Sequence, residues 1–208
     1  MDDITAKLEK IPEPSDARYS CYDTGGVECE VGEFLQGLVR MMKPELVCEL
    51  GTYHGTSDLY IASALKENGF GKLITIEYET INLQIAKERF VKFGLQDFIQ
   101  TELISSLDYQ PTQQFDIILS DTEPNQRYQE VVKYFPSLKA GGFLLIHDCP
   151  PGMCQTGTEF NGMLDWPYGP VPEQMKDWLK DGELVKFHFR TPRGLSCFYK
   201  PGLDDFRP

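Results

Sequence analysis

The sequence predicts an α/β fold with a single doubly wound, mostly parallel seven-stranded sheet, helices on both faces and a C-terminal antiparallel hairpin. Three observations predict it. Five apolar runs alternate with helical segments, two further runs stand close together near the C-terminus, and the length of 208 residues suits one domain. Alternation of strands and helices requires crossover connections, so we expect the first five strands to be parallel.

Short apolar runs predict the strands, which we place at 46–50, 72–77, 98–103, 115–120, 142–147, 184–190 and 195–200. Apolar residues at helical spacing predict helices at 33–43, 56–68, 80–93 and 127–139, with Gly69, Gly94 and Gly141 near the ends of the last three. Only residues 191–194 separate the last two strands. That length permits a hairpin turn but no crossover helix, so one of the two strands must run antiparallel to the rest.

We expect one domain over residues 1–208, with residues 1–32 as an N-terminal cap segment. Residues 149–172 are rich in proline and glycine and predict a long loop. Long ordered loops often serve as lids, and here Trp166 and Tyr168 are candidate contacts to a substrate ring. The alternative is a linker to a helix at 173–180, pinned down by its aromatic side chains.

The net charge of the chain indicates which kinds of partner are disfavoured. Lys plus Arg number 20 against 32 for Asp plus Glu, so the net charge is −12. This field repels phosphate backbones, and we therefore expect no nucleic-acid partner and no membrane partner. No apolar run is long enough for a membrane helix, and the N-terminus lacks the positive segment of a signal peptide, which favours a cytoplasmic protein. The six cysteines form no CxxC pair and are expected to be reduced.

The turn after the first parallel strand carries the most information about a ligand, because doubly wound sheets bind ligands outside the carboxyl ends of their strands. Residues 49–57 read Glu-Leu-Gly-Thr-Tyr-His-Gly-Thr-Ser. A dinucleotide fingerprint needs glycine where Tyr53 and Thr56 stand. The Glu49 carboxylate disfavours phosphate and suits an ammonium or sulfonium group, whereas a helix N-terminus with the Ser57 hydroxyl suits a carboxylate. Glu77 ends the next strand, at a spacing typical of a carboxylate that accepts ribose hydroxyls. The predicted ligand is an amino acid joined to a nucleoside.

Four motifs in order resemble a known family. They are Glu-x-Gly-x-x-x-Gly-x-Ser from residue 49, Leu-Ile-Thr-Ile-Glu at 73–77, Phe-Asp-Ile-Ile-Leu-Ser-Asp at 115–121, and Leu-Lys-Ala-Gly-Gly-Phe-Leu-Leu-Ile-His-Asp at 138–148. Together they resemble the class I S-adenosylmethionine-dependent methyltransferases, specifically the small-molecule O-methyltransferases of the catechol O-methyltransferase type. The resemblance covers about residues 27–150 and resumes at 193–195 and 198–202. It implies a Rossmann-like methyltransferase fold, S-adenosylmethionine as cofactor, and methyl transfer to a hydroxyl by in-line displacement.

The resemblance also implies roles for individual residues. Gly51, Tyr53 and Ser57 would hold the methionine part, Glu77 the ribose hydroxyls, and Tyr78 with Ser105 or Ser106 would lie near the adenine. Asp121 would face the methionine amino group or a metal. The expected cofactor-binding set is Glu49, Gly51, Thr52, Tyr53, Gly55, Ser57, Glu77, Tyr78, Ser105, Ser106 and Asp121. The segment 25–27 corresponds to the stretch that closes over the cofactor.

The catalytic side departs from the family pattern. Catechol-type enzymes hold magnesium with an Asp after the fourth strand and an Asp-Asn pair after the fifth. Asp121 and Asp148 match the first two positions, but Cys149 stands where the Asn is expected, and a thiol is a poor ligand for a hard cation. The lysine expected near Pro124 is absent as well.

Three interpretations follow for these catalytic candidates, Asp121, His147 and Asp148. A divalent metal such as magnesium could bind Asp121 and Asp148, with water or Glu123 completing its shell. His147 could act as the base, although a histidine beside an aspartate is more often structural. In the third interpretation no metal and no base acts, and catalysis is mostly placement.

The favoured function is thus methyl transfer to a small-molecule acceptor, by a chain that the resemblance also makes a plausible homodimer. The nearest alternative keeps the fold and binds S-adenosylmethionine without methylating a small molecule. An RNA or protein methyltransferase usually brings a basic groove, which the acidic composition disfavours. A nicotinamide-dependent oxidoreductase is disfavoured by Tyr53 at the pyrophosphate position.

Overall fold

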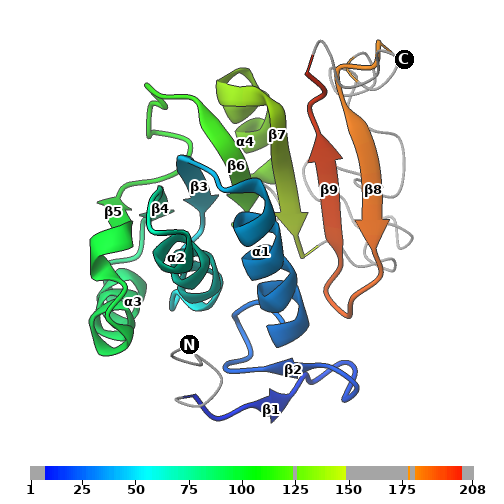
Figure 1. Cartoon of the computed structure of the whole chain (residues 1–208). Helices are drawn as coiled ribbons and strands as arrows, with labels where there is room; N and C mark the ends of the chain where they lie inside the picture. The colour runs from blue at the N-terminus through cyan, green and yellow to red at the C-terminus, as the bar shows by residue number, and fades with distance from the viewer. Residues whose placement is uncertain (1–7, 124–125, 149–177, 179–180, 203–208) are drawn as a thin grey trace. The chain divides into compact units, whose positions relative to one another are not determined.

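The computed structural model describes residues 8–123, 126–148, 178 and 181–202 (Figure 1). The chain divides into two compact units, Met1–Ser106 and Leu107–Pro208. The predicted substrate loop at 149–172, with Trp166 and Tyr168, lies outside the described residues. So does the predicted helix at 173–180, except for Trp178, whose ring stacks on that of Phe135 with 3.9 Å between centroids.

The first unit contains a three-stranded parallel arrangement in the order β5-β4-β3. Its strands are β3 (Leu46–Leu50), β4 (Lys72–Glu77) and β5 (Ile99–Leu103), and its helices are α1 (Cys29–Met42), α2 (Thr56–Asn68) and α3 (Thr80–Phe93). A short 3-10 turn, η2 (Gln96–Phe98), precedes β5. α1 packs on α2 and α2 on α3, so the helices form one layer against the strands (Figure 1). The β3–β4 register places Glu49 opposite Thr75.

The second unit contains strands in the order β6-β7-β9-β8. They are β6 (Phe115–Ser120), β7 (Leu138–His147), β8 (Val185–Phe189) and β9 (Leu195–Tyr199), with helix α4 (Arg127–Tyr134) between β6 and β7. β6 and β7 are parallel, whereas β9 pairs antiparallel with both β7 and β8. The predicted C-terminal hairpin is therefore confirmed. The strand that runs against the others is β9, since it pairs antiparallel with the strand on each of its sides.

All seven predicted strands are present in one mostly parallel sheet with a C-terminal antiparallel hairpin, which confirms the predicted fold class. Helices α2 and α3 have the predicted bounds. Among the described residues, no helix has the length and apolar character that crossing a membrane requires. That the chain acts as one domain stays a prediction.

Several predicted bounds were wrong. α1 begins at Cys29 instead of residue 33, and β7 begins at Leu138 instead of residue 142. The helix expected at 127–139 ends at Tyr134, continues only as the 3-10 turn η3 (Phe135–Ser137), and gives way to β7 at Leu138. Pro136 lacks the N–H that a longer α-helix needs, and Leu138 is buried opposite Phe115, so strand pairing prevails there. The N-terminal segment also contains an unpredicted two-stranded pairing of β1 (Ile11–Pro12) with β2 (Ser20–Cys21), too short to show as a periodic pattern.

Candidate functional site

The turn between β3 and α2 is tightly folded. Gly51, Tyr53 and Gly55 all have positive φ angles, of 94°, 47° and 78°. The N–H groups of Gly51 and Thr52 donate to the Ile76 carbonyl, at 2.9 and 3.3 Å, which ties the turn to the end of β4. Glycine is required at position 55 for two reasons. Its φ angle is left-handed, and a Cβ there would lie 2.6 Å from the Phe90 ring.

Glu77 closes β4 and organises this turn. One of its carboxylate oxygens accepts the backbone N–H of Tyr53 at 2.8 Å, and the other accepts those of Tyr78 and Glu79 at 2.9 and 2.8 Å. The side chain is buried. A carboxylate offers about four lone-pair directions, so these three bonds leave capacity for a ligand hydroxyl. The Ile104 N–H donates to the Glu77 carbonyl at 2.9 Å, which brings the end of β5, just before Ser105 and Ser106, to the end of β4.

A buried polar floor lies beneath the start of α2. The Ser57 hydroxyl donates to the Glu49 carboxylate, and the hydroxyls of Thr52 and Thr75 are 2.6 Å apart. Asp58 is buried beside them, and neither of its oxygens makes a hydrogen bond of ordinary geometry with the part of the chain described here. Burial raises the pKa of Asp58 to about 7, although Thr75 and Glu49 act in the opposite direction. This carboxyl is therefore partly protonated near neutral pH.

The N-terminal loop at 23–26 covers the turn. A Cβ on Gly25 would lie 2.6 Å from the Tyr53 ring, so only glycine permits this approach. Arg89 of α3 donates to the Asp23 carboxylate and to the His54 carbonyl, each at 3.1 Å. The Arg89 guanidinium thus fastens the loop to the turn, as expected of a segment that lies over a ligand site.

Most of the predicted cofactor residues gather at the carboxyl ends of β3, β4 and β5, all within the first unit. Glu49 contacts Ser57, and Tyr53 contacts Glu77. Tyr78 is 57% exposed, whereas Ser106 is buried. The remaining member, Asp121, belongs to the second unit.

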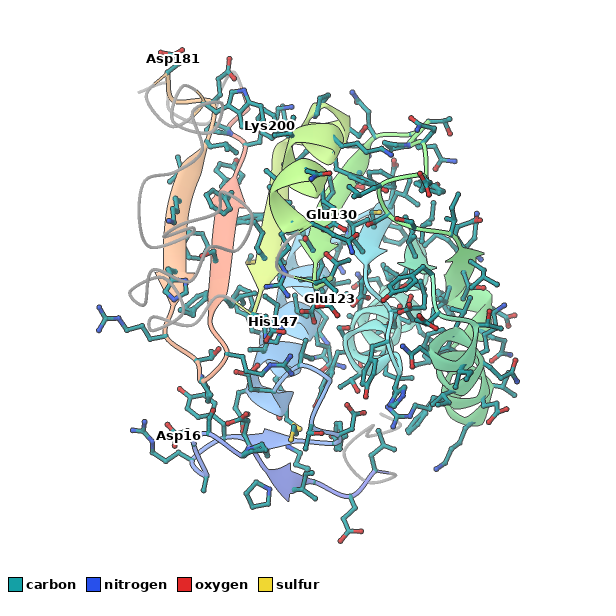
Figure 2. All side chains as sticks on the ribbon, turned by 180° about the vertical axis from the view of Figure 1, so that it is seen from behind. Asp16, Glu123, Glu130, His147, Asp181 and Lys200 are labelled. Carbon is teal, nitrogen blue, oxygen red and sulfur yellow. The ribbon has the colours of Figure 1, made fainter. Side chains whose placement is uncertain are left out.

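The second unit places its candidates at the ends of β6 and β7. Asp121 directly follows β6, His147 is the last residue of β7, and Asp148 follows with a left-handed φ of 56°. Figure 2 labels His147 at this end of the strand. The fully buried His147 has its Nδ1 3.0 Å from Asp121 Oδ1 and 3.6 Å from Asp148 Oδ1. The three predicted catalytic residues are thus brought together.

Two arginines complete this cluster. Arg193, in the β8–β9 turn, grips Asp148 with both arms of its guanidinium: Nε donates to Oδ1, and a terminal nitrogen lies 2.6 Å from Oδ2. Arg127, the first residue of α4, donates to the Asp148 carbonyl at 2.6 Å and to the Thr122 carbonyl. Its guanidinium also lies 3.7 Å from Asp121 Oδ1 and 3.5 Å from Asp148 Oδ2.

These cations set the charge of Asp121. Burial alone would raise the pKa of this carboxyl, but His147, followed by Arg127 and Arg193, outweighs burial and lowers the pKa to about 2. Asp121 is therefore ionised at any physiological pH. The ionised Asp121 carboxylate beside Nδ1 accepts a proton of that nitrogen and fixes the orientation of the His147 ring.

Sequence reasoning missed the roles of Asp58, Arg89, Arg127 and Arg193. Asp58 lies in an amphipathic helical pattern, and nothing in that pattern distinguishes it from acidic residues on the exposed face of a helix. Arg193 meets Asp148 across 45 positions of the chain, a pairing that periodicity and motif spacing do not encode. The only available signal was that a charged residue stands beside a motif position, as Arg193 does before Gly194.

Comparisons with known proteins agree with this arrangement. Residues 48–149 match the family model described as a methyltransferase domain. A protein of Mycobacterium sp. (strain JLS) named as an O-methyltransferase is 32% identical over 128 residues, covering 59% of this chain and 57% of that protein. A catechol O-methyltransferase of Niastella koreensis is 30% identical over 123 residues, covering 56% of this chain and 54% of that enzyme. The chain thus spans just over half the length of these curated relatives.

Solved structures show the same fold. The O-methyltransferase from Bacillus cereus in complex with SAH aligns with a TM-score of 0.71 at 16% identity, covering 86% of this chain and 84% of that one. The O-methyltransferase TomG from Streptomyces achromogenes, in complex with SAM, aligns with a TM-score of 0.62 at 18% identity, covering 85% and 82%. The fold is that of the Rossmann-like methyltransferases. Residues 48–149 thus match a methyltransferase domain, and the chain is similar in sequence to relatives named as O-methyltransferases.

Proposed function

We propose that this chain transfers a methyl group from S-adenosylmethionine to a hydroxyl oxygen of a small molecule. The observation that carries the proposal is the turn at 51–55, held by the Glu77 carboxylate at one end and followed by the buried Glu49–Ser57 pair beneath α2. This arrangement has acceptors for ribose hydroxyls and negative charge for an ammonium or sulfonium group, and it lacks the glycines of a pyrophosphate turn.

On this proposal the first unit binds the cofactor. Bound S-adenosylmethionine would supply an electrophilic methyl group on a positively charged sulfur. Glu77 would accept the ribose hydroxyls with its remaining lone-pair capacity, and Tyr78 with Ser105 or Ser106 would flank the base. Gly51, Thr52, Tyr53 and Gly55 would shape the turn around the methionine part. The negative charge of Glu49 would favour the cationic end of the ligand.

Residues of the second unit would remove the proton of the acceptor hydroxyl. On this proposal ionised Asp121 accepts the Nδ1 proton of His147 in a 3.0 Å contact, which orients the ring. His147 is then the base that removes the hydroxyl proton, and Asp148 is kept ionised by Arg193. Since methyl transfer is an in-line displacement, most of its barrier reduction comes from alignment and the exclusion of water.

Several finer statements belong to the same proposal. The acceptor would contact the loop at 149–172 through Trp166 and Tyr168. The protein would act in the cytoplasm, as one domain and as a homodimer, with no nucleic-acid or membrane partner. Binding of S-adenosylmethionine without methyl transfer is the second candidate. The relatives named as O-methyltransferases do not favour it, nor an RNA or protein methyltransferase or a nicotinamide-dependent enzyme.

Isothermal calorimetry with S-adenosylmethionine and its demethylated product tests the cofactor half of the proposal. We expect micromolar binding of both compounds and no heat with NAD. Glu77→Ala should weaken binding by about 1 to 3 kcal/mol, because a charged hydrogen-bond partner is lost. Glu77→Gln, which keeps the shape of the side chain, should lose less.

Glu79→Gln is the matched control, since it removes an exposed carboxylate two residues away and should leave the affinity unchanged. Unchanged affinity in Glu77→Ala would remove Glu77 from the site. Mass spectrometric detection of methylated product across a panel of phenols and other hydroxyl compounds tests the transfer itself. Binding without any methylated product would favour the second candidate.

A further inference from the structure

The Asp148 carboxylate, which the family resemblance makes a metal ligand, is already taken by a guanidinium. Both of its oxygens face Arg193 in a two-pronged contact, and this fork geometry is the strongest pairing that a carboxylate makes with a side chain. An ion that bound both Asp148 oxygens on the side that faces Arg193 would have to displace this guanidinium first.

A second cation is fixed against the same carboxylates. The Arg127 guanidinium is 3% exposed and is held by two main-chain carbonyls, those of Thr122 and Asp148. It lies 3.5 Å from Asp148 Oδ2 and 3.7 Å from Asp121 Oδ1. Two arginines therefore balance two aspartates without a metal ion.

Distance and charge disagree on whether this cluster fits a divalent ion. One ligand atom from each of Asp121, His147 and Asp148 lies within 4.8 Å of the others, so distance alone would permit an ion. Magnesium, however, requires oxygen ligands at about 2.0 to 2.1 Å in octahedral geometry. An ion placed so would come against two guanidinium groups, and repulsion from the buried one, that of Arg127, is weakly screened. The residues present do not fit a divalent ion.

We propose that Arg193, clamped on Asp148 and backed by Arg127, takes the place of the divalent ion, so that this chain is a metal-independent member of its class. Arg193 and Arg127 are then positioning residues, which hold Asp148 and Asp121 in place and supply the fixed positive charge at the ends of β6 and β7. If the proposed methyl transfer holds, the acceptor needs only one hydroxyl, because there is no metal for two adjacent hydroxyls to chelate.

Binding of Mn²⁺, followed by the electron paramagnetic resonance signal of the free ion, tests this proposal without any measurement of activity. The wild-type protein should bind no Mn²⁺ at this site up to about 1 mM. Arg193→Gln frees the Asp148 carboxylate and removes one cation, so it should gain one site with at least about tenfold higher affinity. Asp148→Asn in the Arg193→Gln background should abolish that gain.

Arg40→Gln is the matched control. It breaks another two-pronged arginine–carboxylate pair, with Glu67, where no second acid and histidine of the described part of the chain converge. It should gain no site. Arg193→Lys, which keeps the charge but loses the fork, should stay as metal-free as the wild type.

Stoichiometric Mn²⁺ binding by the wild type below 1 mM, abolished by Asp148→Asn, would overturn the proposal even if Arg193→Gln proved unable to fold. A folded Arg193→Gln variant that gains no site would overturn the role given to Arg193. Neither outcome depends on S-adenosylmethionine binding, so a failure of the proposed function is distinguishable. Where methyl transfer is detected, a chelator should leave its rate unchanged.

Discussion

Asp58 and Asp121 are both aspartates removed from water, and they differ in almost everything else. Asp58, in the first turn of α2 in the first unit, has the Glu77 carboxylate as the charged neighbour that raises its pKa, whereas Thr75 and Glu49 lower it. Asp121, after β6 in the second unit, is surrounded by His147, Arg127 and Arg193. Burial raises the pKa of the first to about 7, whereas the cations hold that of the second at about 2 despite burial.

Burial alone does not decide whether a carboxyl group is ionised. Without a cation nearby, the cheapest response to desolvation is to keep a proton, and Asp58 does so. With fixed cations the carboxyl stays charged and orders its surroundings, as Asp121 orders His147. A group of acidic side chains with no cation among the interactions that set the pKa, such as the one around Asp58, suits a cationic ligand. A balanced cluster, such as the one around Asp121, suits proton transfer in a fixed geometry.

The largest expected effect comes from removing the cation that the second unit keeps buried. Arg127→Ala leaves Asp121 and Asp148 short of positive charge and frees two carbonyls, so it should destabilise folding by about 3 to 5 kcal/mol. Urea unfolding at pH 7 measures this. The variant should also raise the pKa of Asp121, visible by carboxyl NMR. A loss below about 1 kcal/mol would mean that Arg193 and His147 alone suffice for these aspartates.

The fold and the tight turn after β3 could be predicted from the sequence because both depend on local patterns. The strands at 46–50, 72–77 and 115–120 are apolar runs bounded by turn residues, and they occur with the predicted bounds. The end of α4 was missed because Pro136 stands inside an otherwise helical pattern. Leu138 pairs with Phe115 of β6, and a partner so far away in the sequence is not visible in a local pattern. The Arg193–Asp148 clamp was missed for the same reason, since the topology alone brings the β8–β9 turn to the end of β7.

The two aspartates should make the stability of the protein depend on pH in opposite directions. Asp58 has a higher pKa in the folded state, about 7, than the ordinary value of 3.8, so the folded state binds an extra proton between these pH values. Unfolding releases this proton, and stability must therefore fall as the pH rises from 4 to 7, by at most about 1.4 kcal/mol per pH unit. Asp121 has the opposite sign, because its stabilisation is present above pH 3.8 and is lost as the pH falls toward 2.

Asp58→Asn isolates the first of these effects. The neutral amide keeps the size of the side chain and cannot ionise, so the variant should match or exceed the wild type in stability at pH 8 and lose that advantage at pH 5. Denaturant unfolding of both proteins at several pH values gives the difference directly. A difference that does not change with pH between 5 and 8 would place the proton of this cluster on Glu49 or elsewhere, and would remove Asp58 from the comparison.

The smallest expected effect concerns an ion pair that solvent reaches. Arg40 grips Glu67 as Arg193 grips Asp148, with nitrogen–oxygen distances of 2.5 and 2.8 Å, but both side chains are about one-third exposed or more. Water and salt screen such a pair, so Arg40→Gln should cost at most about 1 kcal/mol, and a double-mutant cycle with Glu67→Gln should find little coupling. Added salt should weaken this pair and spare the buried cluster. If the two clamps proved equal in energy and in salt dependence, desolvation would not be what distinguishes them, and the contrast between Asp58 and Asp121 would need another cause.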